Sequence, residues 1–512
     1  MLAKVRSCAL LGIDGIPLEI EVDIADGLPA FDIIGLPDAS VREAKERVRA
    51  AIRNCGFIFP YSRVTVNLAP ADIKKEGSSF DLAIAVGLLA TTGQIPGNGV
   101  LDERVFIGEL SLDGKLRGVN GTLAMALTLS KSNGYRDTTI FLPAANSTEA
   151  ALVDSITIKP VNSLKDLADY LNGTGSLPTA KQLAASTEED NNMEVDFSEV
   201  RGQETAKRSL EIAAAGSHNA LLYGPPGSGK TMLARRLPTI LPAPTRDEIL
   251  EMTRVHSVAG LLTAGSPLLK TRPFRSPHHS ASTAGIIGGG KVPRPGEVSL
   301  AHLGVLFFDE LPEYRREVLE ALRQPLEDKV VTVTRAAATI TYPADFMFIG
   351  SMNPCPCGNY GDPQQECRCS PPQIFKYRSK LSGPLIDRID IQVEVPGIKY
   401  EQLETRDANG ESSALIRSRV EKARDLQRER YKNIKAGANS TLRSRHFEKY
   451  CPLTRDARQL LHQSFQSLKL SMRAHDRIIK VARTVADLES ADTIGSSHIA
   501  EAVQYRSLDR RE

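Results

Sequence analysis

The chain has 512 residues, of which 41% are hydrophobic and 25% are charged. At roughly 150 residues per domain, this length predicts about three domains, each large enough to bury its own core. The 64 Lys and Arg residues nearly balance the 62 Asp and Glu residues, which leaves a formal charge of +2. This balance excludes a uniformly basic nucleic-acid-binding protein, so that any basic surface is local.

No run of about 18 apolar residues that would span a membrane is present in the sequence. Residues 1–14 also lack the long apolar core and small-residue cleavage site of a secretory signal. We therefore expect a cytoplasmic protein with no membrane partner.

Residues 1–174 alternate short apolar runs with helical patterns. The predicted strands include 64–68, 105–110 and 139–142, and the predicted helices include 40–55, 80–90 and 122–133. This mixture predicts an α+β or α/β domain. Residues 175–199 are polar and carry no hydrophobic period, which is typical of a flexible linker.

The next section, residues 200–396, contains a complete phosphate-binding loop between a predicted strand at 220–223 and a predicted helix. The loop consists of Gly224, Pro225, Pro226, Gly227, Ser228, Gly229, Lys230 and Thr231. Its glycines let backbone N–H groups surround phosphate oxygens at a helix N-terminus. Lys230 is expected to reach the β- and γ-phosphates and Thr231 to ligate Mg²⁺. The chain is therefore predicted to bind a nucleoside triphosphate.

Two later apolar runs end in polar residues. The run 304–308 ends in Asp309 and Glu310, which would place one carboxylate near Mg²⁺ and the other beside an attacking water. Taken alone, this pair is also compatible with a helix N-cap, but its position after the phosphate-binding loop favours catalysis. The run 346–352 ends in Asn353, whose amide is expected to orient the water or sense the γ-phosphate, an ordinary loop residue being the alternative.

Arg388 lies between a helix-like turn and a predicted strand at 391–395. An arginine given to the γ-phosphate of a neighbouring subunit stabilises transition-state charge. From the residues alone, an ordinary surface arginine is the alternative. The last section, residues 397–512, has helical periodicity.

Four of the seven cysteines form a C-x-C-x₉-C-x-C pattern: Cys355, Cys357, Cys367 and Cys369. Four thiolates match tetrahedral Zn²⁺ in number, although C-x-C is tighter than the usual zinc spacing. We expect a structural zinc site, with four reduced thiols in a loop as the alternative. The isolated Cys8, Cys55 and Cys451 are expected to be reduced. The pair His278 and His279 is expected to be a polar loop rather than a pair of metal ligands.

The ordered motifs GPPGSGKT, LFFDE, SMNP and LIDRID resemble those of AAA+ ATPases. The segments 274–280, 288–291 and 295–302 are similar to the magnesium-chelatase-like branch, and within it to the YifB/ComM family. This resemblance covers essentially the whole chain. It implies an α/β AAA+ core at 200–396 and a helical lid or chelatase C-terminal domain at 397–512. It also implies that the protein forms a homo-oligomer, usually a hexamer, and that ATP and Mg²⁺ are held between its subunits. It also implies that Arg388 acts on the next subunit and that Arg473 is a second sensor arginine, with Arg477 as its competitor.

Residues 81–85 and 108–116 resemble the α+β proteolytic domain of Lon proteases, a ribosomal S5 domain 2-like fold. Such proteases use a Ser/Lys pair in which the lysine activates the serine. Ser79 falls near the nucleophile position, but residues 119–125, where the lysine should stand, contain none. We therefore expect a non-proteolytic binding or assembly module. A protease remains an alternative only because Lys74 and Lys75 lie near Ser79 in the sequence.

Two segments are candidates for contact with a polyanion. Residues 330–346 predict a β-hairpin with Arg335 near its tip, which in related ring ATPases projects into the central pore. Residues 416–449 hold eleven Lys or Arg against four Asp or Glu; a solvated lid face is the alternative. Lys291, in a Gly-rich insertion, is a further candidate for DNA contact.

The resemblance to ComM implies a DNA helicase that promotes branch migration in recombination or natural transformation. The alternative is a chaperone-like ATPase that remodels a protein or assists magnesium insertion. A Lon-type protease is the least favoured hypothesis.

Overall fold

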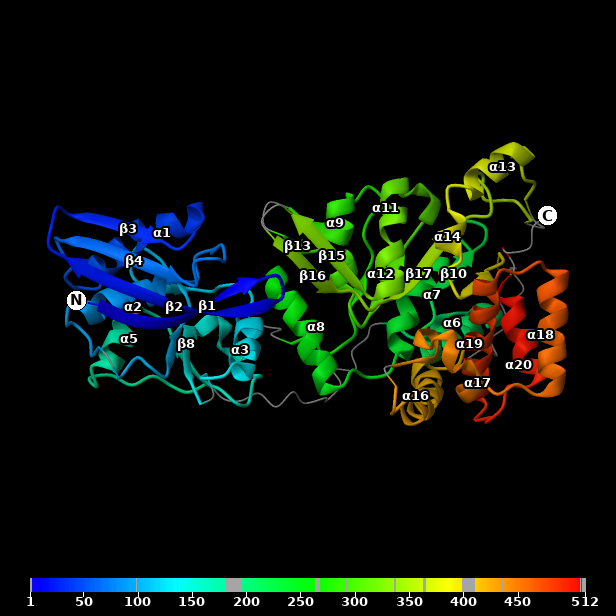
Figure 1. The fold of residues 1–512 in the computed structure, drawn as a ribbon. Helices are drawn as coiled ribbons and strands as arrows, with labels where there is room; N and C mark the ends of the chain where they lie inside the picture. The colour runs from blue at the N-terminus through cyan, green and yellow to red at the C-terminus, as the bar shows by residue number, and fades with distance from the viewer. Residues whose placement is uncertain are drawn as a thin grey trace.

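The structure is a computed structural model that describes residues 2–97, 99–135, 137–180, 195–262, 268–290, 293–335, 338–361, 365–397, 410–434, 436–506 and 508. Three parts follow one another in a row (Figure 1): an N-terminal α/β domain, a central α/β core and a group of C-terminal helices. None of the described helices is long and apolar enough to cross a membrane.

The N-terminal domain is built on a seven-stranded mixed sheet in the order β3-β4-β2-β1-β5-β8-β9. Its strands are β1 (Leu2–Leu11), β2 (Asp14–Ala25), β3 (Ala30–Ile34), β4 (Arg63–Ala69), β5 (Arg104–Phe106), β8 (Thr139–Pro143) and β9 (Thr157–Val161), with a small hairpin of β6 (Glu109–Leu110) and β7 (Leu116–Arg117) beside it. Its helices are α1 (Ala39–Asn54), α2 (Asp81–Thr91), α3 (Thr122–Lys131), α4 (Ser147–Ala150) and α5 (Leu164–Leu171). Every residue of α2 is buried, as expected for a helix that is apolar on all sides.

The central sheet is five-stranded and entirely parallel, in the order β11-β14-β17-β10-β18. Its strands are β10 (Ala220–Tyr223), β11 (Phe274–Arg275), β14 (Val305–Phe308), β17 (Met347–Met352) and β18 (Ile391–Glu394). The continuous apolar runs of β14 and β17 are buried along their whole length, which is typical of parallel strands covered on both faces. The carboxyl ends of all five strands meet at one edge, where ligands bind in open α/β sheets.

Helices and two hairpins surround this sheet. The helices are α6 (Glu204–Gly216), α7 (Lys230–Arg236), α8 (Arg246–Ala259), α9 (Thr283–Ile287), α10 (Glu297–Leu300), α11 (Arg316–Ala321), α12 (Arg323–Asp328), α13 (Pro371–Arg378) and α14 (Gly383–Ile386). The hairpins are β12–β13 (Gly288–Gly289 and Arg294–Pro295) and β15–β16 (Val330–Arg335 and Ala338–Pro343). The hairpin predicted at 330–346 is therefore present as β15–β16.

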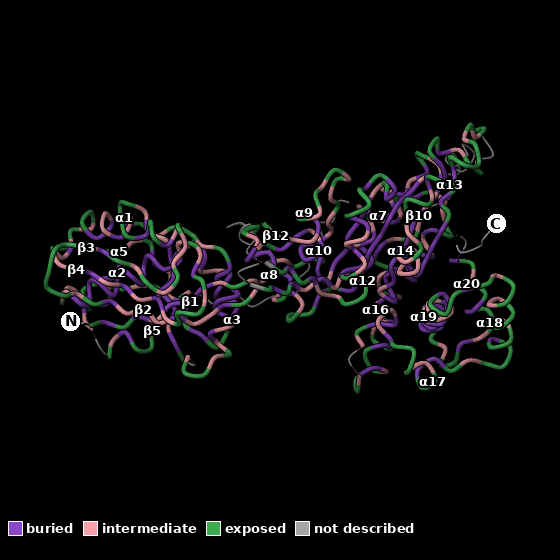
Figure 2. Tube along the Cα trace, turned by 45° about the horizontal axis from the view of Figure 1, so that its top comes forward, coloured by how far each residue is buried: buried purple, intermediate pink, exposed green. Residues whose placement is uncertain are grey.

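The C-terminal helices are α16 (Ser413–Arg430), α17 (Phe447–Tyr450), α18 (Arg455–Ser467), α19 (Met472–Leu488) and α20 (Ser496–Gln504). Figure 2 shows α19 buried among its neighbours, whereas α18 is largely exposed. One hydrophobic cluster runs from Leu222 in β10 through Ala213 in α6 to Val420 in α16 and Ala482 in α19. The C-terminal helices and the central sheet therefore share a single core.

The N-terminal domain contacts the core through the β1–β2 turn and α8. The Arg254 guanidinium donates to the Ile13 carbonyl oxygen at 2.8 Å and forms an ion pair with Asp14. Gly12 has a φ of +65°, and a Cβ atom there would lie 2.4 Å from Cγ2 of Ile340 in β16. The tip of the β1–β2 hairpin thus fits against β15–β16 only because it carries a glycine.

Candidate functional site

The phosphate-binding loop connects β10 to α7 at the carboxyl edge of the central sheet. Gly229, which precedes the first residue of α7, has a φ of +91°, a conformation that favours glycine. A Cβ atom at Gly224 would lie 2.0 Å from the Val395 carbonyl oxygen. Two of the loop's glycines are therefore required by backbone geometry, and the loop leads into the N-terminus of a helix as the sequence predicted.

The Lys230 side chain lies over its own loop and reaches towards Asn353. Its ammonium donates to the carbonyl oxygens of Gly224 and Pro225, both at 2.8 Å, and to the Asn353 side-chain oxygen at 3.3 Å. Burial lowers the pKa of Lys230 to about 8, although Asp309 and Glu310 act in the opposite direction. A phosphate placed here would compensate the desolvated ammonium.

Asp309 is held through both carboxylate oxygens. The Thr231 hydroxyl donates to one oxygen at 2.8 Å, and the Ser351 hydroxyl donates to the other. Ser351 also accepts a hydrogen bond from the backbone N–H of Glu310 at 3.1 Å. Glu310 has a φ of +52°, an uncommon conformation for a residue other than glycine that is frequent at functional sites.

Ser351 is the residue of this cluster that sequence reasoning missed. It lies in β17, and the register pairs Phe308 of β14 with Gly350 of β17, which brings Ser351 level with Asp309. A single hydroxyl inside the otherwise apolar run 346–352 was the available signal. Its meaning depends on knowing that β14 and β17 are neighbours.

Glu310 and Asn353 line the same cavity of about 760 Å³. Its wall also includes Cys357 and Cys369, together with side chains from the region of α13: Gln373, Lys376, Tyr377 and Lys380. The structure thus brings Lys230, Thr231, Asp309, Glu310 and Asn353 to one edge of the sheet. These five residues were predicted separately from three segments of the sequence.

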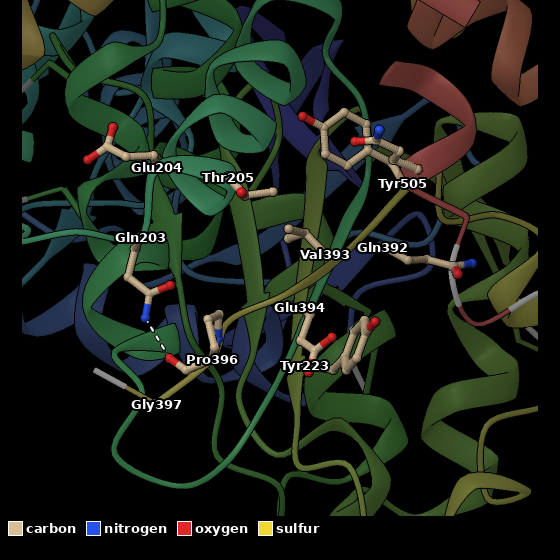
Figure 3. A pocket seen from close by; sticks show the side chains of 11 residues that line it. Gln203, Glu204, Thr205, Tyr223, Gln392, Val393, Glu394, Pro396, Gly397 and Tyr505 are labelled. Carbon is tan, nitrogen blue, oxygen red and sulfur yellow. Dashed lines mark hydrogen bonds between the residues drawn. The ribbon is translucent and has the colours of Figure 1, made fainter. Parts of the chain in front are cut away.

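A second cavity, of about 530 Å³, is shown in Figure 3. It is lined by Gln203, Glu204, Thr205, Tyr223, Gln392, Val393, Glu394, Pro396, Gly397, Gln504 and Tyr505. The Gln203 amide donates to the Pro396 carbonyl oxygen at 2.7 Å and to the Ser228 carbonyl oxygen at 3.3 Å. Gln203 therefore connects this cavity to the phosphate-binding loop. The sequence did not predict it, because its walls come from α6, β10, β18 and α20.

Comparison with known proteins identifies the chain's relatives. A family model described as magnesium chelatase, subunit ChlI, matches residues 196–403, and two further ChlI models match residues 20–146 and 410–506. A Salmonella typhimurium protein named YifB is 43% identical over 511 residues, covering 99% of this chain and 98% of that protein. The competence protein ComM of Haemophilus influenzae is 43% identical over 512 residues with the same coverage. The chain belongs to the YifB/ComM family of magnesium-chelatase-like proteins.

The Lon-like part of this family member has weaker support. Lon protease 2 of Bacillus subtilis is 28% identical over 158 residues, which is 27% of this chain. Ser79 is buried; Lys75 donates to the Pro70 carbonyl oxygen, and Lys74 pairs with Glu76 at 2.6 Å. Within the described residues, no hydrogen bond joins Ser79 to either lysine.

The three candidate arginines converge on the segment 387–390. Arg388 donates to the Pro384 carbonyl oxygen at 2.7 Å and pairs with Glu327 of α12. The exposed Arg473 lies 3.6 Å from the Asp387 carboxylate, and the half-buried Arg477 lies 2.5 Å from the Asp390 carboxylate.

Asp390 is fully buried. Burial raises the pKa of this carboxyl, but Arg477 and His218 outweigh that effect and hold the pKa well below its usual range. The ion pair with Arg477 therefore joins α19 firmly to the segment that carries Arg388, whereas Arg473 remains the more available of the two sensor candidates.

Only some of the residues expected to contact DNA lie within the described ranges. Arg335 ends β15 at the tip of the hairpin, whereas Lys291 lies outside the described residues. In α16, Arg419 pairs with Glu211 and Glu411, and Arg430 pairs with Asp487 at 2.6 Å. These two arginines therefore already have carboxylate partners within the chain.

The four clustered cysteines meet in space. Their sulfur atoms all lie within 4.8 Å of one another, and in the part of the chain that the structure describes they are the one group of His, Cys, Asp or Glu side chains with this property. The His278 ring nitrogen instead contacts the Ser280 hydroxyl at 2.8 Å. The structure therefore agrees with the expectation of a polar loop at His278 and His279.

Proposed function

We propose that the protein is a ring-forming ATPase that acts on DNA, as a helicase promoting branch migration in recombination or natural transformation. The observation that carries the ATPase half is the single cluster of Lys230, Thr231, Asp309, Glu310 and Asn353. It contains the parts that nucleotide hydrolysis requires, namely a phosphate-binding cation, oxygen ligands, a base and a polar group that orients water.

The oxygen ligands fit Mg²⁺. Thr231 and Asp309 offer a hydroxyl and a carboxylate 2.8 Å apart, and hard oxygen ligands of this kind suit that ion. Thr231 and Asp309 would hold Mg²⁺, which supplies charge neutralisation at the phosphates. Lys230 binds the β- and γ-phosphates, Glu310 accepts the proton of the attacking water, and Asn353 orients that water or senses the γ-phosphate.

The cavity of Figure 3 is the proposed binding site of the purine base. Gln203 connects it to the phosphate-binding loop through a hydrogen bond to the Ser228 carbonyl oxygen, which supports placing the base next to the phosphates. Tyr223 and Tyr505 provide aromatic surface, and Gln392 provides an amide. Six of the eleven lining residues are polar, namely Gln203, Glu204, Thr205, Gln392, Glu394 and Gln504, and they offer donors and acceptors for the polar edge of the base.

Hydrolysis is proposed to be completed by a neighbouring copy. Arg388 would supply charge to the γ-phosphate of the next subunit of a hexamer, and Arg473 would report phosphate loss to the C-terminal helices. Support comes from the ion pairs of Arg473 and Arg477 with the segment that carries Arg388. A displacement of α19 would be transmitted along this segment.

DNA is the proposed substrate. The family relative ComM is named a competence protein, and the β15–β16 hairpin has Arg335 at its tip. Val331 and Ile340 of this hairpin share a hydrophobic cluster with Phe308, which directly precedes Asp309. A change at Asp309 would therefore reach the hairpin through packed side chains.

The alternative function, remodelling a protein or assisting magnesium insertion, is favoured by the match of residues 196–403 to a magnesium chelatase model. Measuring ATP turnover with single-stranded, duplex and branched DNA separates the two proposals, together with a branch-migration assay. We expect turnover to rise with DNA and binding to weaken steeply with salt. Glu310→Gln is the control that should bind ATP without hydrolysing it, and a turnover that no DNA changes would favour the alternative.

A further inference from the structure

The four-cysteine cluster has the geometry of a metal site. Cys355 Sγ lies 3.4 Å from Cys357 Sγ and 3.7 Å from Cys367 Sγ, and Cys357 and Cys367 are also 3.7 Å apart. Four thiolates at about 2.3 Å from a tetrahedral zinc ion are about 3.8 Å from one another. A disulfide would require about 2.0 Å, and all four cysteines are free. The spacing therefore matches ligation of one ion rather than oxidation.

The loop that carries the thiols has no regular secondary structure among its described residues. Between Asn353 and α13, the described residues form no helix or strand, and Cys355 is the one cysteine of the four that is buried. Chains without a hydrophobic core of their own usually depend on a cross-link or a metal.

The same loop forms a wall of the nucleotide site. Cys355 follows Asn353 by two residues, and Cys357 and Cys369 line the cavity that contains Glu310 and Asn353. Gly358 approaches the phosphate-binding loop so closely that a Cβ atom there would lie 2.5 Å from Cδ of Pro226. On its other side, the loop is attached to α13, because Arg378 Nε donates to the Pro354 carbonyl oxygen at 3.1 Å.

We propose that Cys355, Cys357, Cys367 and Cys369 bind one structural Zn²⁺, and that this ion fixes Asn353 in position beside Lys230. Four soft thiolate ligands select zinc over magnesium or calcium, and four protein ligands complete a tetrahedron, so that the ion is structural. The positioning role rests on the proposed ATPase function, whereas the metal site itself does not.

The metal site is tested by metal analysis of the reduced full-length protein. We expect one Zn²⁺ per chain, thiols that become reactive only after chelation, and, on replacement with Co²⁺, the visible absorption of a tetrahedral thiolate complex. Cys367→Ser should lose the metal, whereas Cys55→Ser, a matched change at a thiol outside the cluster, should retain it. Less than half an equivalent of zinc, an iron–sulfur chromophore, or equal zinc in both variants would overturn the proposal.

The positioning role is tested separately by removing zinc from the intact wild-type protein with a chelator and restoring it. Nucleotide binding should persist while turnover falls about 100-fold, the effect of a misplaced catalytic group, and added Zn²⁺ should restore it. In the Asn353→Ala variant, chelation should cause no further loss, because the two changes act on one step. Full turnover without zinc would refute the positioning role, whereas absence of turnover in the zinc-loaded protein would instead count against the ATPase proposal.

Discussion

Replacing Ser351 by alanine tests how Asp309 is held. Ser351 is 1% exposed; its hydroxyl donates to the Asp309 carboxylate and accepts from the Glu310 N–H. Loss of a hydrogen bond to a charged group costs about 1.5–3 kcal/mol, and each 1.4 kcal/mol corresponds to about tenfold in rate. We therefore expect Ser351→Ala to lower kcat for ATP by about 10- to 100-fold, while the contacts of Lys230 and ATP affinity are retained.

The assay is steady-state ATP turnover beside equilibrium binding of a fluorescent ATP analogue. Ser209→Ala is the matched control, because Ser209 is equally buried but its hydroxyl only donates to the Ala206 carbonyl oxygen within α6. Ser351→Thr keeps a hydroxyl and should recover part of the activity. Turnover of Ser351→Ala equal to that of the Ser209 control would refute the proposed role of this hydroxyl.

Three further predictions concern other parts of the molecule. Because burial lowers the Lys230 pKa to about 8, ATP affinity measured by titration should fall as pH rises through that value in the wild type and stay flat in Lys230→Ala. Mixing Arg388→Ala with Lys230→Ala subunits should restore some turnover if Arg388 acts in trans; intact rings without recovery would indicate a cis role. Glu149→Ala removes the acceptor of the Ser257 hydroxyl at 2.6 Å and of the Thr122 hydroxyl and the Asn146 amide, and it should lower the free energy of unfolding by about 1–3 kcal/mol. Asp154→Ala, which removes an exposed ion pair with Arg246 of α8, should cost less than about 1 kcal/mol; equal losses would contradict this difference between a buried and an exposed contact.

The grouping of the phosphate-binding loop, Asp309 and Asn353 at one edge of the sheet was predictable, because each of these parts is local in sequence. The phosphate-binding loop has its own strand, glycines and helix, and Asp309 and Asn353 each end an apolar run. Ser351 was not predictable, because its role arises from the pairing of β14 with β17. For the same reason, a count of charges along α16 could not predict that Arg419 pairs with Glu211 and Glu411.

The other features that the sequence did not predict are contacts between parts that are distant in sequence. The cavity of Figure 3 takes residues from four elements, and hydrophobic periodicity says nothing about how such elements meet. The contact of Glu149 with Ser257 likewise joins two parts that the sequence describes separately. Local structure, such as the strand and helix that flank the phosphate-binding loop, was therefore predictable from the sequence, whereas assembly across strands and domains required the fold.

The close contact between Gly12 and Ile340 limits the directions in which β15–β16 can travel. A methyl group would already overlap at this point, so the hairpin has no free space towards the N-terminal domain. If the proposed ATPase moves this hairpin, the movement would lead away from the N-terminal domain or displace the domain with it. In the first case the N-terminal domain would limit the movement, and in the second its contact with α8 would couple the domain to the hairpin.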